Sequence, residues 1–135
     1  MDENVRILIA LRVERCREDM AVARTLLAQG FWRVAVNRAY YAVFHMATAS
    51  LLTLGIARTK HTGVQAAFGQ YIIKAGLIEP EYHRIYLRAL TLREEADYAD
   101  EIRTLNAERV STLVTDAERF VGRLERYLHD VGAIS

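Results

Sequence analysis

The sequence predicts an all-α protein, most simply an up-and-down bundle of four to five helices. Turn residues are scarce: the 135 residues include one proline and seven glycines, whereas a sheet protein needs a turn every few residues. Apolar residues also recur at helical spacing along several long segments. Because 52% of the residues are hydrophobic and 26% are charged, we expect an ordinary globular protein with one domain over residues 1–135.

The first two helices are expected over residues 4–29 and 31–54. The first carries an apolar stripe that repeats about every 3.6 residues, and Gly30 ends or bends it. The second is apolar almost all the way round, so neighbouring elements must enclose it. Its polar residues are confined to one strip. Since burying polar groups costs free energy unless they are paired, this strip indicates partners or a functional site.

Capping signals predict the third helix. Thr62 followed by Gln65 reads as a capping box, in which each side chain bonds the other residue's backbone N–H. The helix is therefore expected to run over residues 62–74, with Gly76 closing it.

Two further helices complete the predicted bundle. Pro80 suits the first turn of a fourth helix over residues 80–98, because proline lacks the N–H that a first turn leaves unpaired. Asn106 caps a fifth helix that extends to Leu128, with apolar residues at helical spacing. The sequence thus places five helices in one chain.

Charge is unevenly distributed along the chain. The net charge is +1, which gives no overall field to attract nucleic acid or a membrane. Residues 6–38 nevertheless hold seven arginines against three carboxylates, whereas residues 79–101 hold seven carboxylates against three arginines. Either the two segments attract each other across the bundle, or the basic segment lines an anion-binding groove.

The single cysteine, Cys16, cannot form an internal disulfide and is expected to fill space in the core of a cytoplasmic protein. The first residues lack the order of a secretory signal. Residues 39–57 lack charged side chains apart from His45, and we interpret them as a buried helix rather than a membrane span.

Arg38 and His45 are the candidate catalytic pair. At about 100° per residue they lie within about 20° of each other on a helix, and about 10.5 Å apart along it. An arginine can hold a phosphate and a histidine can move a proton, which together suit phosphodiester chemistry. The alternative is structural: Arg38 pairs with a carboxylate such as Asp97, and His45 is a hydrogen-bonded core residue.

Other kinds of site lack their sequence patterns. No histidine is preceded by glutamate three positions earlier, as helical di-iron sites require, and no zinc-type cluster of cysteine and histidine is present. The glycine-rich loops that hold nucleotide phosphates are also absent. The sequence therefore predicts neither a metal nor a cofactor.

Three blocks of sequence resemble the HEPN-domain family. Residues 37–45 (NRAYYAVFH) are similar to the family signature SRAYYAxFH. Residues 59–64 (TKHTGV), followed by FGQY at 68–71, resemble the family's KTHxGV loop and the helix after it. Residues 92–98 (LREEADY) resemble the LRxxADY segment that closes the family's fourth helix.

The resemblance implies a helical bundle that forms a homodimer, and a metal-independent ribonuclease of toxin–antitoxin type. It implies that Arg38 and His45 of both subunits line one cleft, with RNA as substrate and a minimal nucleotidyltransferase as antitoxin. Asn37 and Tyr41 would orient the imidazole or the phosphate. A second phosphate contact is expected from Lys60 and His61.

Two positions depart from the family pattern. Ala39 stands where active ribonucleases commonly have a polar residue, and Ala47 replaces the tyrosine that is adenylylated in other members. Two other functions therefore stay open. One is a non-catalytic module that docks a nucleotidyltransferase, and the other is a nucleotide-binding domain without turnover.

Overall fold

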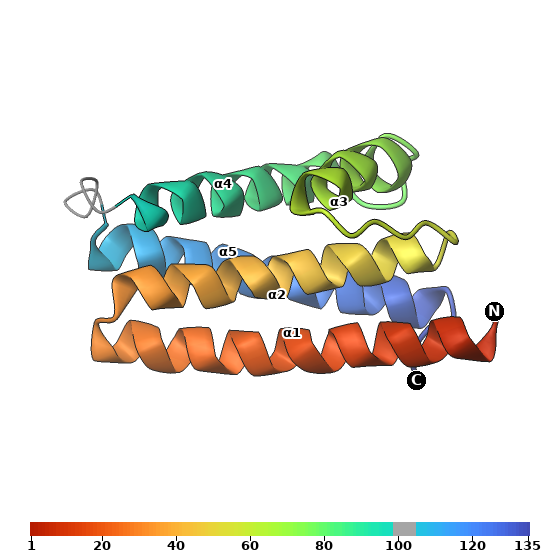
Figure 1. Ribbon diagram of the computed structural model, residues 1–135, viewed down its shortest axis with the longest axis horizontal. Helices are drawn as coiled ribbons and strands as arrows, with labels where there is room; N and C mark the ends of the chain where they lie inside the picture. The colour runs from red at the N-terminus through yellow and green to blue at the C-terminus, as the bar shows by residue number, and fades with distance from the viewer. Residues whose placement is uncertain (99–104) are drawn as a thin grey trace.

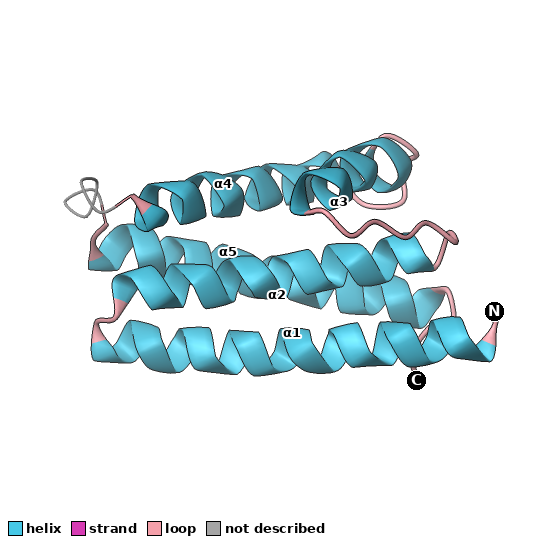
Figure 2. Ribbon diagram, in the orientation of Figure 1, coloured by secondary structure: helices cyan, strands magenta, loops and turns pink. Residues whose placement is uncertain are grey.

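The computed structural model describes residues 1–98 and 105–135, which form five α-helices and one short π-helix. These elements are α1 (Glu3–Gln29), α2 (Trp32–Leu52), α3 (His61–Ala67), the π-helix η1 (Phe68–Ile73), α4 (Pro80–Asp97) and α5 (Ala107–Asp130). The long helices α1, α2, α4 and α5 lie side by side and alternate in direction (Figure 1). No strand occurs among the described residues (Figure 2), which confirms the predicted all-α bundle.

Most predicted helix ends are confirmed by local geometry. Gly30 ends α1 in the left-handed conformation, with φ of 81°. Pro80 occupies the first turn of α4, where no intrahelical bond needs its nitrogen. The Asn106 side chain accepts a hydrogen bond from the Arg109 backbone N–H at 2.9 Å and so caps α5.

The predicted capping box of the third helix is wrong. The helix begins one residue earlier, at His61, and its N-terminal flanking residue Lys60 makes no side-chain cap. The Gln65 amide instead contacts His83 Nε2 on α4 at 3.1 Å. Because the Gln65 side chain bonds His83 on another helix, it does not bond the backbone N–H that a capping box requires.

The π-helix η1 is a second difference from the expected regular helix. Its Gly69 faces the His83 ring, and a Cβ atom at that position would lie 3.0 Å from His83 Cε1. The absence of a side chain at Gly69 thus lets α4 approach the wider turns of η1. Gly76, with φ of 80°, follows the segment as predicted.

Helix α2 is the centre of the core, as its apolar composition predicts. It packs against α1, α4 and α5 and against the α3–η1 segment. Every residue from 42 to 51 is buried. Beside it, Phe68, Tyr86 and Phe120 form an aromatic cluster that joins η1, α4 and α5. The site on α2 is therefore held by an enclosed helix.

Cys16 is a free, fully buried thiol on the core side of α1. Burial raises its pKa to about 12, and the carboxylates of Glu125 and Asp19 add to this effect. This placement agrees with the predicted space-filling role.

Ion pairs between α4 and α5 neutralise much of the acidic segment. Glu79 pairs with Arg123, Glu81 with Arg119, and Glu95 with Arg109. These three glutamates therefore face arginines of α5, and within the described part of the acidic segment no ion pair reaches the first helix. In the described ranges 1–98 and 105–135, no helix has the length and apolar character needed to cross a membrane.

Candidate active site

Arg38 and His45 lie on the face of α2 that meets α1, and both contact one carboxylate. Arg38 NH1 donates to Asp19 Oδ1 at 2.9 Å, and His45 Nε2 lies 3.3 Å from Asp19 Oδ2. The predicted common face of the two residues is thus present. The structural alternative also agrees with the structure in part, because Arg38 pairs with a carboxylate and His45 is buried and bonded. The carboxylate is Asp19 and not Asp97, the example that the sequence suggested, which lies beside Arg93 at 4.0 Å.

Arg12 of α1 contacts the other side of the His45 ring. Its NH1 atom lies 3.1 Å from His45 Nδ1, and its guanidinium lies over the Phe44 ring, 5.8 Å from the centroid. Arg15 lies one turn before Asp19 on the same helix and is exposed, whereas Arg12 is half-buried. Among the described residues, no carboxylate is within ion-pair distance of Arg12 or Arg15. The site therefore combines Arg38 with two guanidinium groups that have no carboxylate partner there.

The electrostatic surroundings keep His45 neutral. Burial lowers the pKa of His45 to about 4, and the positive charges of Arg12, Arg15 and Arg38 act in the same direction. Only 9% of the residue is exposed. Near pH 7 the imidazole is therefore unprotonated on one ring nitrogen, the form that can accept a proton.

Burial also raises the pKa of Asp19, although its ion pair with Arg38 acts in the opposite direction. The carboxylate is exposed over only 12% of its side chain, whereas the Arg38 side chain is 39% exposed. Asp19 is therefore more enclosed than Arg38 and about as enclosed as His45, whose side chain is 11% exposed. The outer donors of the Arg38 guanidinium stay accessible to an anion.

An aromatic cluster borders the pair. The Arg38 guanidinium lies over the Tyr41 ring at 5.1 Å, and Arg93 of α4 lies 5.5 Å from the same ring. His61 packs against Phe44 with ring centroids 4.3 Å apart, and against Tyr41 at 5.5 Å. The structure therefore brings Tyr41 and His61 to the rim of the site.

Two of the predicted site residues are placed differently. Asn37 donates its amide to the Arg33 carbonyl at 3.2 Å, so its side chain is engaged along its own helix. Lys60 is exposed before the start of α3, and its side chain has no hydrogen bond or ion pair with the described residues. Neither contacts the imidazole of His45.

Sequence reasoning missed Arg12, Asp19 and Arg93. Arg12 and Asp19 are seven residues apart, the same spacing as Arg38 and His45, so each pair lies on one face of its helix. This equal spacing could have indicated that the two pairs face each other across adjacent helices. Arg93 lies in the block of residues 92–98 that resembles the family, and its contacts with Tyr40 and Tyr41 give it a place beside the site.

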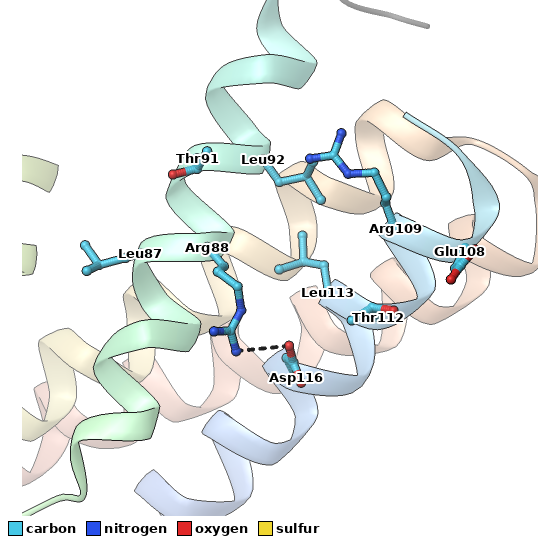
Figure 3. Close-up of a pocket in the computed structure, with 9 residues that line it drawn as sticks. All are labelled: Leu87, Arg88, Thr91, Leu92, Glu108, Arg109, Thr112, Leu113 and Asp116. Carbon is cyan, nitrogen blue, oxygen red and sulfur yellow. Dashed lines mark hydrogen bonds and ion pairs between the residues drawn. The ribbon is translucent and has the colours of Figure 1, made fainter. Parts of the chain in front are cut away.

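A cavity of about 410 Å³ lies elsewhere, between α4 and α5 (Figure 3). Leu92 and Leu113 line it, and the ion pair between Arg88 and Asp116, at 3.3 Å, crosses one end. None of its nine lining residues belongs to the site at Arg38. In the portion of the chain that the structure describes, no group of three or more metal-ligating side chains is gathered.

The family match agrees with this geometry. A family model of the HEPN domain matches residues 9–127. The chain belongs to the HEPN family. The match includes α2 with Arg38 and His45, and it also includes Arg12 and Asp19 on α1.

HEPN relatives from archaea and bacteria are similar along nearly the whole chain. A candidate toxin of Methanocaldococcus jannaschii is 36% identical over 131 residues, which are 97% of this chain and 96% of that protein. A UPF0332 protein of Thermotoga maritima is 34% identical over 131 residues, 97% and 98% of the two chains. A second Methanocaldococcus jannaschii candidate toxin is 28% identical over 116 residues, 86% and 78% of the two chains. Two of these three relatives are thus named as candidate toxins.

Proposed function

We propose that this HEPN protein is a metal-independent endoribonuclease of toxin–antitoxin type. The observation that supports this proposal is the convergence of Arg38 NH1 and His45 Nε2 on the two oxygens of one anionic group, the Asp19 carboxylate. A guanidinium and an imidazole that meet at one anion on a rigid helix suit the binding and cleavage of a phosphodiester.

The proposed reaction is attack by the RNA 2′-hydroxyl on the adjacent phosphorus. His45 takes the hydroxyl proton, the 2′-oxygen bonds to phosphorus, and the bond from phosphorus to the 5′-oxygen breaks. The leaving oxygen takes a proton from His45 of a second copy, and the upstream fragment ends in a 2′,3′-cyclic phosphate. Each proton transfer contributes roughly 10²- to 10⁴-fold to the rate. Arg38 stabilises the extra negative charge of the pentacoordinate transition state.

The charges around His45 suit both of its proposed roles. In the free protein a pKa of about 4 makes the imidazole a base near pH 7. The arginines that contribute to this low pKa are the groups that a bound phosphodiester would neutralise. Substrate binding should therefore raise the pKa of the second histidine toward the value that an acid needs.

A second copy of the chain is the proposed dimer partner. Leu8, Leu11 and Val22 on α1 and Val34 on α2 are exposed apolar residues. Leu8 and Leu11 lie seven and four residues before Arg15, Val22 lies three residues after Asp19, and Val34 lies four residues before Arg38. At these helical spacings they share a face with the charged residues and flank the site. Pairing two such faces would bury these side chains and bring two Arg38–His45 pairs together. A minimal nucleotidyltransferase is the proposed antitoxin.

Supporting roles follow from position. Tyr41 and His61 lie at the rim and are proposed to contact the substrate backbone or a base beside the scissile phosphate. Lys60, exposed next to His61, is proposed to hold a second phosphate. Asn37 would have to release the Arg33 carbonyl before it could take part.

The test is cleavage of single-stranded RNA by the purified protein in the presence of a chelator. We expect 2′,3′-cyclic phosphate ends, and we expect His45→Ala and Arg38→Ala to abolish cleavage while the protein stays folded. His129→Ala and Arg84→Ala are matched controls, because both side chains are exposed and lie outside the site. Cleavage that survives His45→Ala, or that stops with the chelator, would contradict the proposal.

The second candidate function is a non-catalytic module that docks a nucleotidyltransferase. Two observations favour it: Asp19 already engages both Arg38 and His45, and Ala39 is fully buried in the core rather than at the site. Stable copurification with a nucleotidyltransferase, without cleavage of any RNA offered, would support this module against the ribonuclease.

A further inference from the structure

The His45 ring lies between two charged groups of opposite sign, both from α1. Asp19 Oδ2 lies 3.3 Å from Nε2, and Arg12 NH1 lies 3.1 Å from Nδ1. The two contacts are on opposite sides of the imidazole, and neither residue belongs to the Arg38–His45 motif on α2.

These two neighbours define which ring nitrogen holds the proton. A guanidinium has only N–H groups to offer, so the nitrogen that it approaches must supply a lone pair. Nδ1 is therefore the acceptor from Arg12. In the neutral ring the proton is then on Nε2, which faces Asp19 Oδ2 at 3.3 Å.

We propose that Asp19 is a positioning residue that holds the His45 proton on Nε2, so that Nδ1 is the atom that takes the 2′-hydroxyl proton, and that Arg12 releases Nδ1 to bind the RNA phosphate. This inference rests on the proposed ribonuclease function. The proton that Nδ1 gains comes from the 2′-hydroxyl, and the resulting imidazolium is stabilised by the carboxylate on Nε2.

The position of Asp19 supports a positioning role. Its second oxygen holds Arg38 NH1 at 2.9 Å, so one carboxylate orients both residues of the motif. The side chains of Asp19 and His45 are exposed over only 12% and 11%, so the carboxylate and the ring are enclosed together where α1 meets α2. If Asp19 instead occupied the place of the substrate phosphate, its removal would increase cleavage.

Arg12 is suited to move. It is partly exposed, and the one hydrogen bond of its side chain within the described residues is to Nδ1. A phosphate that enters beside Nδ1 would meet the Arg12 guanidinium. A guanidinium at Nδ1 in addition to Arg38 would bind RNA more tightly than Arg38 alone.

Every charged or titratable group near the imidazole bears on this test. Those on other helices are Arg12, Arg15 and Asp19 of α1 and His61 of α3, and those on α2 are Arg38 and Tyr41. The three arginines and His61 oppose protonation of the ring, whereas the negative charge of Asp19 favours it. Neutralising Asp19 should therefore make the ring harder to protonate.

The first experiment measures ¹⁵N chemical shifts of the His45 ring by NMR in the full chain, without RNA. We expect the proton on Nε2 near pH 7 in the wild type. Because Arg12 by itself keeps Nδ1 an acceptor, the effect of Asp19 is measured in an Arg12→Ala background. Arg12→Ala should keep the proton on Nε2, whereas Arg12→Ala with Asp19→Asn should give a mixture of tautomers. Arg12→Ala with Glu18→Gln is the matched control, because it removes a neighbouring carboxylate that is exposed and has no contact with the ring. It should leave the tautomer unchanged. A wild-type proton on Nδ1, or equal spectra with and without Asp19→Asn in the Arg12→Ala background, would overturn the proposal.

The second experiment measures RNA cleavage. Asp19→Asn should lower kcat at least about tenfold with little change in KM, and should move the acid limb of the pH profile to lower pH. Asp19→Asn with raised activity would overturn the positioning role. The NMR measurement needs no RNA. A proton on Nδ1 in the wild type would therefore refute this inference, whether or not the protein cleaves RNA. The expected tautomer without any cleavage refutes the proposed function, and with it the role of Nδ1.

The third experiment concerns Arg12. Binding of an RNA with a 2′-deoxy residue at the cleavage site should weaken about tenfold or more in Arg12→Ala, while the His45 tautomer is retained through Asp19. Arg17→Ala is the control, since Arg17 lies on the same helix but pairs with Glu125. Equal effects of the two variants would overturn the role of Arg12.

Discussion

Arg38 and His45, two turns apart on α2, are joined through the two oxygens of Asp19 on α1, at 2.9 and 3.3 Å. The geometry of the pair therefore depends on how α1 docks on α2, and not on α2 alone. Any change that shifts α1 along α2 should change the relative positions of the guanidinium and the imidazole. The following predictions test the dimer face, the buried histidine and the packing that keeps these helices in register.

The exposed apolar side chains of α1 are predicted to form the dimer face. Leu11 is 40% exposed, and an aspartate there would place a charge in an apolar interface. We expect Leu11→Asp to convert the dimer into a folded monomer, as measured by analytical ultracentrifugation together with circular dichroism. Leu87 on α4 is 39% exposed, and Leu87→Asp should leave the dimer intact. The same oligomeric state in both variants would contradict this face.

Stability should fall as the pH is lowered from about 6.5 toward 4. The pKa of His45 is about 4 in the folded protein against 6.5 as its ordinary value, so in this interval the unfolded chain binds a proton that the folded protein does not. The loss reaches up to about 3 kcal/mol for His45. Burial lowers the pKa of His61 and His83 as well, which adds in the same direction.

The opposite sign applies to Asp19, because burial raises its pKa in the folded protein. Protonation of Asp19 in the folded protein therefore offsets part of the loss of stability near pH 4. Urea unfolding at a series of pH values measures the total, and His45→Gln should flatten the dependence. His129→Gln, at an exposed position, should retain it. Equal slopes for wild type and His45→Gln would count against the buried neutral imidazole.

Two tyrosines are predicted to respond oppositely to loss of the hydroxyl group. Tyr86 is fully buried, and its hydroxyl has no hydrogen-bond partner among residues 1–98 and 105–135. Tyr86→Phe should therefore raise the free energy of unfolding, by up to about 1 kcal/mol. Tyr127 contacts Thr53 Oγ1 at 2.9 Å, and Tyr127→Phe should lower the free energy of unfolding by about 1 kcal/mol. Chemical denaturation of both variants distinguishes these outcomes.

Alanine substitutions at two helical glycines are also predicted to have opposite effects on stability. A Cβ atom at Gly122 on α5 would meet no atom within 4 Å, so Gly122→Ala should raise the free energy of unfolding by about 1 kcal/mol. A Cβ atom at Gly69 would lie 3.0 Å from His83 Cε1, so Gly69→Ala should lower it by about 1–3 kcal/mol. Thermal unfolding of the two variants provides the measurement. A stabilising Gly69→Ala would show that η1 does not need the close approach of His83.

Much of the fold could be predicted because its boundaries are set locally. Gly30, Pro80 and Asn106 act through their own backbone or side chain, so the sequence is sufficient to place the helix ends near them. The third helix differed because Gln65 bonds His83 from another helix. A contact between elements distant in sequence cannot be derived from capping residues alone.

The candidate site was predictable only along one helix. The spacing of Arg38 and His45 determines that they share a face of α2, and this held. Which side chains meet them depends on the docking of α1, and helix periodicity leaves that arrangement open. For this reason the expected carboxylate partner was Asp97, whereas the structure places Asp19 there.

The burial of Cys16 gives the molecule an internal reporter of opening. Since its thiol is enclosed and its pKa is raised to about 12, a water-soluble disulfide reagent should modify the folded protein only when α1 separates from the rest of the bundle. The rate of labelling would therefore follow how often this helix detaches. Because Asp19 is three residues away on the same helix, the same rate would show how long His45 keeps its partner.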